Sequence, residues 1–139
     1  MKGLLSVLVV VALLVGACAC KQKSVEQPAV TATIRTVDID EFEKVMTQPD
    51  VVLLDVRTSE EYAEKHLKNA ILIDVKQSSF REECLKRLPA GKTIAVYCRT
   101  GFRSKSAGNI LVEEGFNVIN MRGGITAWVE AGKEVVTGQ

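Results

Sequence analysis

The sequence predicts an α/β fold, with a mostly parallel central sheet and helices on both faces. From residue 33 onward, short apolar runs alternate with segments of helical periodicity. Two of the runs, 51–56 and 93–97, are apolar at nearly every position, which is typical of parallel strands buried on both faces. Because strand and helix alternate, we expect successive strands to be parallel and joined by helical crossovers.

The first half of the folded region contains three predicted strands and two predicted helices. Asp38 precedes an apolar periodic segment and has Glu41 three residues later, as in a capping box. Pro49 ends that helix, and Thr58 or Ser59 can cap the next one. The predicted order is a strand at 33–37, a helix to residue 46, a strand at 51–56, a helix to residue 64 and a strand at 70–73.

The second half repeats the alternation. Ser78 or Ser79 starts a helix that Pro89 stops, and Gly115 is a typical residue for the end of the following helix. The predicted order is a helix to residue 88, a strand at 93–97, a helix at 104–114, a strand at 117–120 and a last helix from residue 125. Cys84 and Trp128 lie on the expected core faces of their helices.

Composition limits the classes of function. The chain has 139 residues, and its 18 Lys and Arg against 17 Asp and Glu give a net charge of +1, so no global field attracts nucleic acid. The four cysteines and the single His66 show no metal-ligand spacing. We therefore expect no metal, no cofactor and no nucleic-acid partner, and we expect a monomer.

The stretch from the strand at 93–97 into residue 104 places a cysteine where a thiolate is expected. Cys98 follows the strand directly, and a glycine-containing loop then runs into a helix. Loop N–H groups, the positive end of the helix, and the charges of Arg99 and Arg103 each lower a cysteine pKa. Because the thiolate is the reactive form, Cys98 is the predicted nucleophile.

A second strand end carries polar residues. In parallel α/β sheets, ligands bind beyond the carboxyl ends of the strands, where both Cys98 and the pair Asp55 and Arg57 are expected. Asp55 is interpreted as structural support, because a buried carboxylate at a strand end usually accepts hydrogen bonds from loop amides. Two roles stay open for Arg57: membership of that network, or binding of an anionic substrate.

Four segments spread over residues 34–136 carry a larger pattern. They are Leu54-Asp55-Val56-Arg57; Glu61-Tyr62 with His66-Leu67 and Ala70; Cys98-Arg99-Thr100-Gly101-Phe102-Arg103-Ser104; and Gly123-Gly124-Ile125 with Ala127-Trp128. In this order and spacing they resemble the single-domain rhodaneses, which transfer a sulfane sulfur.

The resemblance implies a rhodanese-like fold and a mechanism centred on Cys98. Its thiolate would take the outer sulfur of a small anionic donor such as thiosulfate, forming a persulfide and releasing sulfite. A thiophilic acceptor (cyanide, a thiol or a protein cysteine) would then remove the sulfur. The residues implied to bind the donor and persulfide, through main-chain N–H groups and the two arginines, are Arg99, Thr100, Gly101, Phe102, Arg103 and Ser104.

Other functions stay open beside this one. Cys98 would also suit a persulfide carrier or redox binding module that acts with a protein partner. Phosphatases and arsenate-type enzymes on the same fold have their arginine six residues after the cysteine, whereas Arg103 comes five residues after Cys98. The loop length therefore favours sulfur over phosphate, and the intact cysteine disfavours a catalytically silent scaffold.

The first residues predict export and lipidation. A basic start and an apolar run lead to Leu14-Val15-Gly16-Ala17-Cys18, which resembles a bacterial lipobox. We expect a signal peptide at 1–17, an acylated Cys18, a tether at 18–32 and the rhodanese domain at 33–139. The domain would be anchored by lipid to a membrane of the bacterial cell envelope, facing the periplasm or the exterior. An ordinary cleaved signal, an uncleaved anchor, or cleavage before Cys20 are the alternatives.

Overall fold

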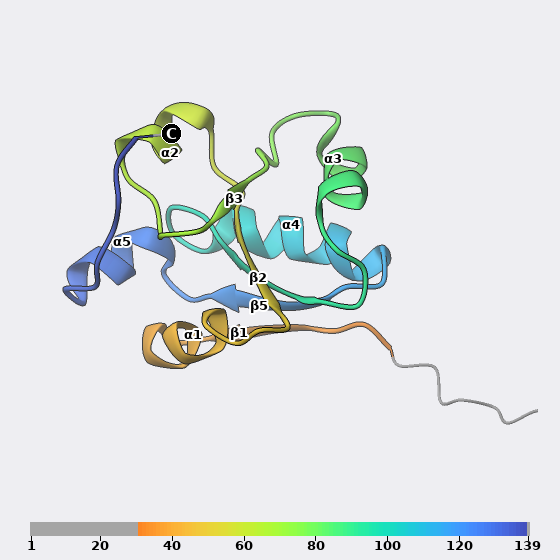
Figure 1. Ribbon diagram of the computed structural model, residues 1–139, viewed down its shortest axis with the longest axis horizontal. Helices are drawn as coiled ribbons and strands as arrows, with labels where there is room; N and C mark the ends of the chain where they lie inside the picture. Colours follow the sequence, from red (N-terminus) through yellow and green to blue (C-terminus); the bar gives the residue numbers. More distant parts are fainter. Residues whose placement is uncertain (1–30, 139) are drawn as a thin grey trace, which may run out of the picture.

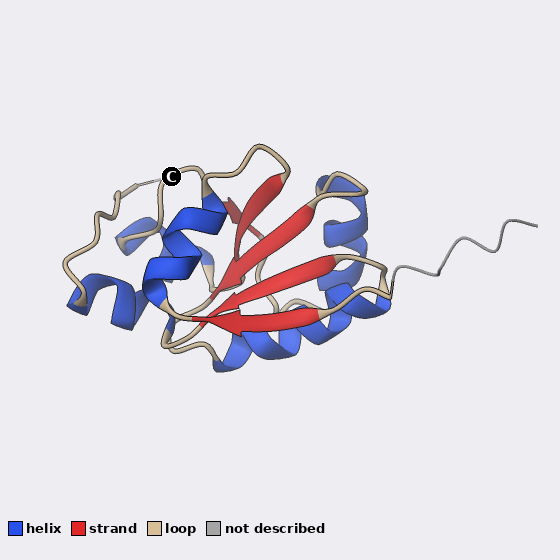
Figure 2. Cartoon of the chain, turned by 90° about the horizontal axis from the view of Figure 1, so that it is seen from below, coloured by secondary structure: helices blue, strands red, loops and turns tan. Residues whose placement is uncertain are grey.

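Five strands form one parallel sheet in the computed structural model, which describes residues 31–138 (Figure 1). The sheet order is β1-β5-β4-β2-β3, and the strand arrows in Figure 2 run in a common direction. This confirms the predicted α/β fold. The strands are β1 (Ile34–Val37), β2 (Val51–Asp55), β3 (Ile71–Leu72), β4 (Thr93–Tyr97) and β5 (Asn117–Met121).

Helices cover both faces of the sheet and enclose two hydrophobic clusters. The cluster on one face contains side chains of α3 and α4, and the cluster on the other contains side chains of α1 and α5. Cys84 of α3 and Trp128 of α5 are buried in these clusters, as predicted. The helices are α1 (Ile39–Met46), α2 (Ser59–Glu64), α3 (Phe80–Arg87), α4 (Phe102–Glu113) and α5 (Gly124–Glu130).

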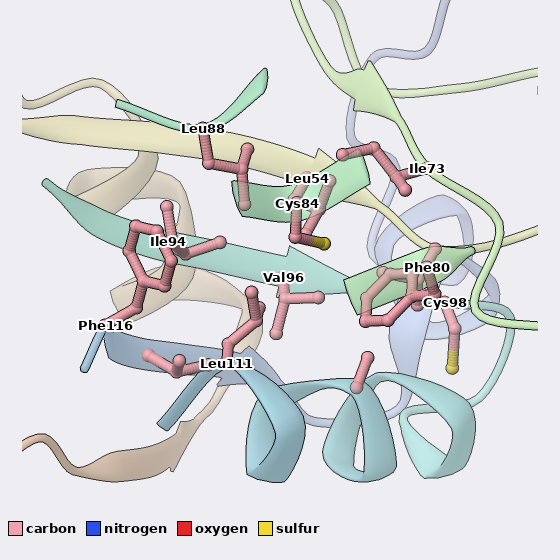
Figure 3. Packing of buried hydrophobic residues seen from close by; sticks show 13 residues of the cluster. Leu54, Ile73, Phe80, Cys84, Leu88, Ile94, Val96, Cys98, Leu111 and Phe116 are labelled. Atoms are coloured by element: carbon pink, nitrogen blue, oxygen red, sulfur yellow. The ribbon is translucent and has the colours of Figure 1, made fainter. Parts of the chain in front are cut away.

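Strand β4 is central, and its alternation decides where Cys98 points. Ala95 and Tyr97 belong to the cluster on the α1 and α5 side, whereas Ile94 and Val96 belong to the cluster on the α3 and α4 side. Side chains alternate along a strand, so Cys98, the next residue after Tyr97, points toward α3 and α4. Figure 3 shows Cys98 at the end of the cluster on the α3 and α4 side, beside Phe80.

Helix caps follow the sequence signals. Asp38 accepts a hydrogen bond from the Glu41 amide at 2.9 Å, and Thr58 and Glu61 form a reciprocal capping box at the start of α2. The helix after Cys98 starts at Phe102, two residues earlier than predicted. The reason is that Gly101 takes the N-cap position with a left-handed φ of 95°.

The C-terminal segment closes over α2, which the sequence pattern did not indicate. Val136 forms an antiparallel bridge with His66, and the amide of Gly138 donates to the Ala63 carbonyl at 2.9 Å. This contact brings the end of the described chain beside α2 (Figure 1). Within residues 31–138, no helix is long and apolar enough to cross a membrane. The predicted signal peptide, Cys18 and most of the tether lie outside the described residues.

Candidate active site

The Cys98 sulfur lies in a hydrogen-bonding cradle made by the residues that follow it. The amide of Gly101 donates to Sγ at 3.1 Å, and the Ser104 hydroxyl lies 3.4 Å from the same atom. Cys98 itself is only 1% exposed. A sulfur enclosed by donors in this way is suited to carry negative charge.

The hydrogen bonds of the loop lower the pKa of Cys98. Burial alone raises the pKa of this thiol. The Ser104 hydroxyl and the amides of Ser104, Thr100 and Gly101 outweigh that effect, so the pKa lies below the ordinary value of 9.0. The charges of Arg99 and Arg103, which the sequence analysis named beside the loop N–H groups, are not among these leading causes. The cradle is therefore mainly a set of neutral donors aimed at the sulfur.

The start of α5 holds the loop in the orientation that this cradle needs. The amide of Ile125 donates to the Cys98 carbonyl at 2.9 Å, and the amide of Thr126 donates to the Arg99 carbonyl at 3.1 Å. Because α5 binds these two carbonyls, it fixes the orientation of the loop backbone, in which the Gly101 N–H faces the sulfur. Gly124 allows the close approach, since a Cβ there would lie 2.5 Å from the Arg99 and Cys98 carbonyl oxygens.

Ser104 connects the sulfur to a buried amide. Its hydroxyl lies 2.6 Å from Oδ1 of Asn120, a β5 residue that is 2% exposed. The Asn120 amide nitrogen in turn donates to the Gly101 carbonyl at 3.4 Å and to Thr36 Oγ1 at 3.3 Å. Asn120 thus contacts the loop at two points.

Asp55 and Arg57 form a buried ion pair at the end of β2. Nη2 of Arg57 lies 2.6 Å from Oδ2 of Asp55 and also donates to the Lys65 carbonyl at 2.7 Å. Asp55 accepts the backbone amide of Arg57 at 2.9 Å, and the guanidinium lies 5.6 Å from the centre of the Tyr97 ring. Both charged side chains are at most 3% exposed. Arg57 therefore belongs to the structural network, which was one of its two open roles; binding of substrate by Arg57 stays a prediction.

Arg103 has a partner that the sequence did not reveal. Its Nη1 and Nη2 donate to the two carboxylate oxygens of Glu61 at 2.9 and 2.7 Å. The hydrogen bond that Arg103 donates to Glu61 is the main cause that raises the pKa of Arg103, and attraction to Cys98 adds to it. Arg103 thus remains a fixed positive charge near the sulfur, while its role in binding a donor stays a prediction.

The other predicted loop residues form the outer rim. Arg99 and Thr100 are exposed, and Phe102 is 80% exposed. Arg99 also lines a cavity of about 390 Å³ beside the loop, together with Arg57, Ile125 and Val129. A larger cavity of about 670 Å³ is lined by residues of α1 and β2. Cys98 lines neither of these two cavities.

His66 packs against a neighbouring side chain and has a structural role. It stacks on Tyr62 with a centroid separation of 3.6 Å, and its Nδ1 lies 2.9 Å from the Tyr62 carbonyl oxygen. Across residues 31–138, no three His, Cys, Asp or Glu side chains gather in a group that could hold a metal ion.

Residues 38–131 match the family of rhodanese-like domains. A sulfurtransferase from Allochromatium vinosum is 34% identical over 88 residues, which cover 63% of this chain and 79% of the relative. A tRNA uridine(34) hydroxylase from Cytophaga hutchinsonii is 35% identical over 103 residues, which cover 71% of this chain but only 33% of the hydroxylase. A solved rhodanese-related protein from Thermoplasma volcanium has a TM-score of 0.65 at 32% identity, over 73% of this chain and 97% of that one.

Proposed function

Since the chain belongs to the rhodanese-like domain family, we propose that it is a sulfurtransferase that carries sulfane sulfur as a persulfide on Cys98. The likeness to the Allochromatium vinosum sulfurtransferase, which spans 79% of that protein, supports this type of activity. The chain spans a third of the Cytophaga hutchinsonii hydroxylase, so we do not carry the activity in that protein's name over to this chain.

One observation carries the proposal: Cys98 Sγ accepts a hydrogen bond from the Gly101 amide at 3.1 Å within a loop that lowers its pKa. Donors that are already in place stabilise a sulfur anion without reorganisation. They suit the resting thiolate and, equally, the negative outer sulfur of a persulfide.

The first half-reaction loads the sulfur. The Cys98 thiolate attacks the outer sulfur of thiosulfate or a similar donor, a new S–S bond forms, and the S–S bond of the donor breaks. Sulfite leaves with the electron pair of that bond, so charge and electrons balance without an oxidant. Arg99, Arg103 and Arg57 would attract the anionic donor.

The second half-reaction unloads it. A thiophilic acceptor attacks the outer sulfur of the persulfide, and Cys98 leaves again as a thiolate. With cyanide the product is thiocyanate; with a thiol or a protein cysteine the product is a new persulfide. Phe102, which follows Gly101 in the loop, is 80% exposed and lies on the side from which an acceptor would approach.

A phosphatase or arsenate-type activity is less well supported. The position six residues after Cys98 holds Ser104, which is buried, and not an arginine. A persulfide carrier that is loaded only by a protein partner remains the second candidate, and it differs from the first by its inactivity toward small donors.

We also propose that Cys18 anchors the domain by lipid to a membrane of the bacterial cell envelope, on the periplasmic or outer side. Support comes from the sequence alone, in which a basic start and an apolar run lead to Leu14-Val15-Gly16-Ala17-Cys18. The donor and acceptor would then be found outside the cytoplasm.

The test uses the full chain with thiosulfate and cyanide, and follows the release of thiocyanate. We expect Cys98→Ser to lower the rate about a thousandfold or more, because the nucleophile is lost. Mass spectrometry after thiosulfate alone should find one added sulfur on the peptide with Cys98. Cys84→Ala is the matched control, since that buried thiol lies in the core.

Equal rates in the wild type and Cys98→Ser would overturn the proposal. Persulfide on Cys98 that forms only with a protein donor would select the carrier instead. Hydrolysis of an aryl phosphate that depends on Cys98 would favour the phosphatase.

A further inference from the structure

The Ser104 hydroxyl has two acceptors within reach and a single proton to donate. One acceptor is Cys98 Sγ at 3.4 Å, and the other is Asn120 Oδ1 at 2.6 Å. The contact with Asn120 is the shorter by 0.8 Å, and part of that difference reflects the larger radius of sulfur. The two acceptors therefore compete for one proton, and the amide oxygen lies at the shorter distance.

The surroundings of Asn120 fix which end of its amide faces Ser104. Its other end lies 3.4 Å from the carbonyl oxygen of Gly101, which can only accept a hydrogen bond. The amide nitrogen must therefore face Gly101, and Oδ1 must face Ser104. At 2% exposure, Asn120 has little freedom to turn away.

Strand alternation places this amide on the same side of the sheet as the sulfur. Val118 of β5 belongs to the cluster that contains Cys98, and Asn120 comes two residues later in the same strand. A buried polar side chain at a position where the strand pattern expects an apolar one requires partners. Asn120 finds them in the loop of Cys98 and in Thr36.

We propose that Asn120 is a positioning residue that competes with the Cys98 sulfur for the Ser104 hydroxyl proton and so tunes the reactivity of the thiol. When the proton lies on the Asn120 side, Ser104 stabilises the sulfur less than when the proton is turned toward Sγ. When the thiolate forms, its full charge draws the same proton toward sulfur, and the Asn120 oxygen loses its partner. The amide therefore restrains ionisation of Cys98 while it keeps the loop in place.

The charged groups near the Cys98 sulfur are the same in the wild type and in the Asn120 variants. Arg103 of α4 attracts the Cys98 sulfur electrostatically and is paired with Glu61 of α2. Asp74, which precedes α3, also attracts Arg103 electrostatically. Arg57 and Asp55 pair with each other at the end of β2. Substitutions at Asn120 leave all of these groups in the chain.

The test measures the rate at which iodoacetamide alkylates Cys98 as a function of pH, by peptide mapping of the full chain. Asn120→Leu has a similar shape but no acceptor, and should lower the pKa of Cys98 by about one unit, roughly the worth of one freed hydrogen bond. Asn120→Asp is a stronger acceptor with negative charge, and should raise the pKa. Asn120→Ala repeats the first test with a smaller side chain, in case the leucine variant does not fold.

A purely structural role predicts a different pattern. If Asn120 only braced the loop, every substitution would misalign the N–H donors and raise the pKa of Cys98. Opposite shifts in Asn120→Leu and Asn120→Asp therefore support the competition, and shifts of the same sign overturn it.

The Ser104→Ala background decides whether Asn120 acts through the hydroxyl. There the lowering by Asn120→Leu or Asn120→Ala should vanish, since no shared proton remains; a shift that persists would overturn the proposal. The inference rests on Cys98 as the reactive thiol of the proposed sulfurtransferase. The alkylation assay measures the pKa of Cys98 whether or not the protein transfers sulfur. A failure of the proposed function and a failure of the proton competition therefore give different results.

Discussion

Glu61 and Arg103 are 42 positions apart in the chain, and their side chains form a two-point ion pair, with Nη1–Oε2 at 2.9 Å and Nη2–Oε1 at 2.7 Å. Each side chain is only 23% exposed. The same carboxylate accepts the Thr58 amide at 3.1 Å in the capping box of α2. Glu61 therefore joins the start of α2 to the first turn of α4, directly after the reactive loop.

We predict that this ion pair makes folding stability depend on pH in the acid range. The hydrogen bond from Arg103 is the main cause that lowers the pKa of Glu61 to about 2, from an ordinary 4.5. Between these values the unfolded chain binds more protons than the folded one, so stability increases with pH. The contribution of Glu61 is thus complete above about pH 4.5 and is lost as the pH falls through about 2.

The measurement compares urea unfolding of the wild type and Glu61→Gln from neutral to acid pH. Glutamine can still close the capping box, so the variant removes mainly the charge. We expect Glu61→Gln to be less stable by about 1 kcal/mol at neutral pH, and the gap to shrink as the pH falls below 4.5. Glu113→Gln, which breaks an exposed pair with Arg81, is the control and should change little. A gap that stays constant across this range would contradict the prediction.

The two described cysteines should differ in reactivity. Burial raises the pKa of Cys84 to about 12, whereas the loop donors lower the pKa of Cys98. Since alkylation requires the thiolate, iodoacetamide at mildly alkaline pH should modify Cys98 in the native protein and leave Cys84 unmodified. Peptide mapping after a short pulse checks this, and the denatured protein, in which both should react, is the control. Equal native rates would show that the loop does not activate Cys98.

Local patterns in the sequence predicted much of the fold and the position of the cysteine. Apolar runs identified the strands, and strand β4 leads directly to Cys98 as expected. Partners distant in sequence could not be derived in this way, because a contact such as Glu61 with Arg103 depends on how two helices pack. For the lowered pKa of Cys98, the sequence predicted loop N–H groups, the helix end and two arginine charges together, and the leading causes in the structure are the loop donors.

Two further residues, Asn120 and Gly124, stand out in the sequence, but only the structure shows what each contacts. Asn120 is a polar residue at an inward position of an apolar strand, which marks a buried hydrogen-bonding site but not its partners. Gly124 was part of the family resemblance, without a physical reason. The reason is now the contact of α5 with the backbone of Cys98 and Arg99.

The predicted lipid anchor has a direct test with a control two residues away. In a bacterium that processes lipoproteins, Cys18→Ala should move the full chain from the membrane fraction to the soluble fraction, because acylation needs that thiol. Cys20→Ala should leave the protein in the membrane fraction. If Cys18→Ala stays bound to membranes, an uncleaved apolar helix is the anchor; if only Cys20→Ala is released, Cys20 is the acylated residue.

The contact between α5 and the reactive loop predicts that Gly124 is needed for both stability and catalysis. Its φ is +61°, and an added Cβ would lie 2.5 Å from the backbone of Arg99 and Cys98. Gly124→Ala must therefore strain the backbone and also push α5 away from the two carbonyls that it holds. We expect a loss of at least about 2 kcal/mol in the free energy of unfolding. We also expect a fall in the sulfur-transfer rate of about tenfold or more, because small displacements of catalytic donors are costly.

Gly91 provides the matched control for this substitution. Its φ of +77° is also left-handed, but an added Cβ would meet nothing within 4 Å. Gly91→Ala therefore carries the cost of the backbone conformation alone, about 1 kcal/mol, and should keep the wild-type rate. The difference between the two variants isolates the steric contact with the loop. If Gly124→Ala behaved like Gly91→Ala in both unfolding and rate, α5 would not hold the loop, and the orientation of the Cys98 donors would need another cause.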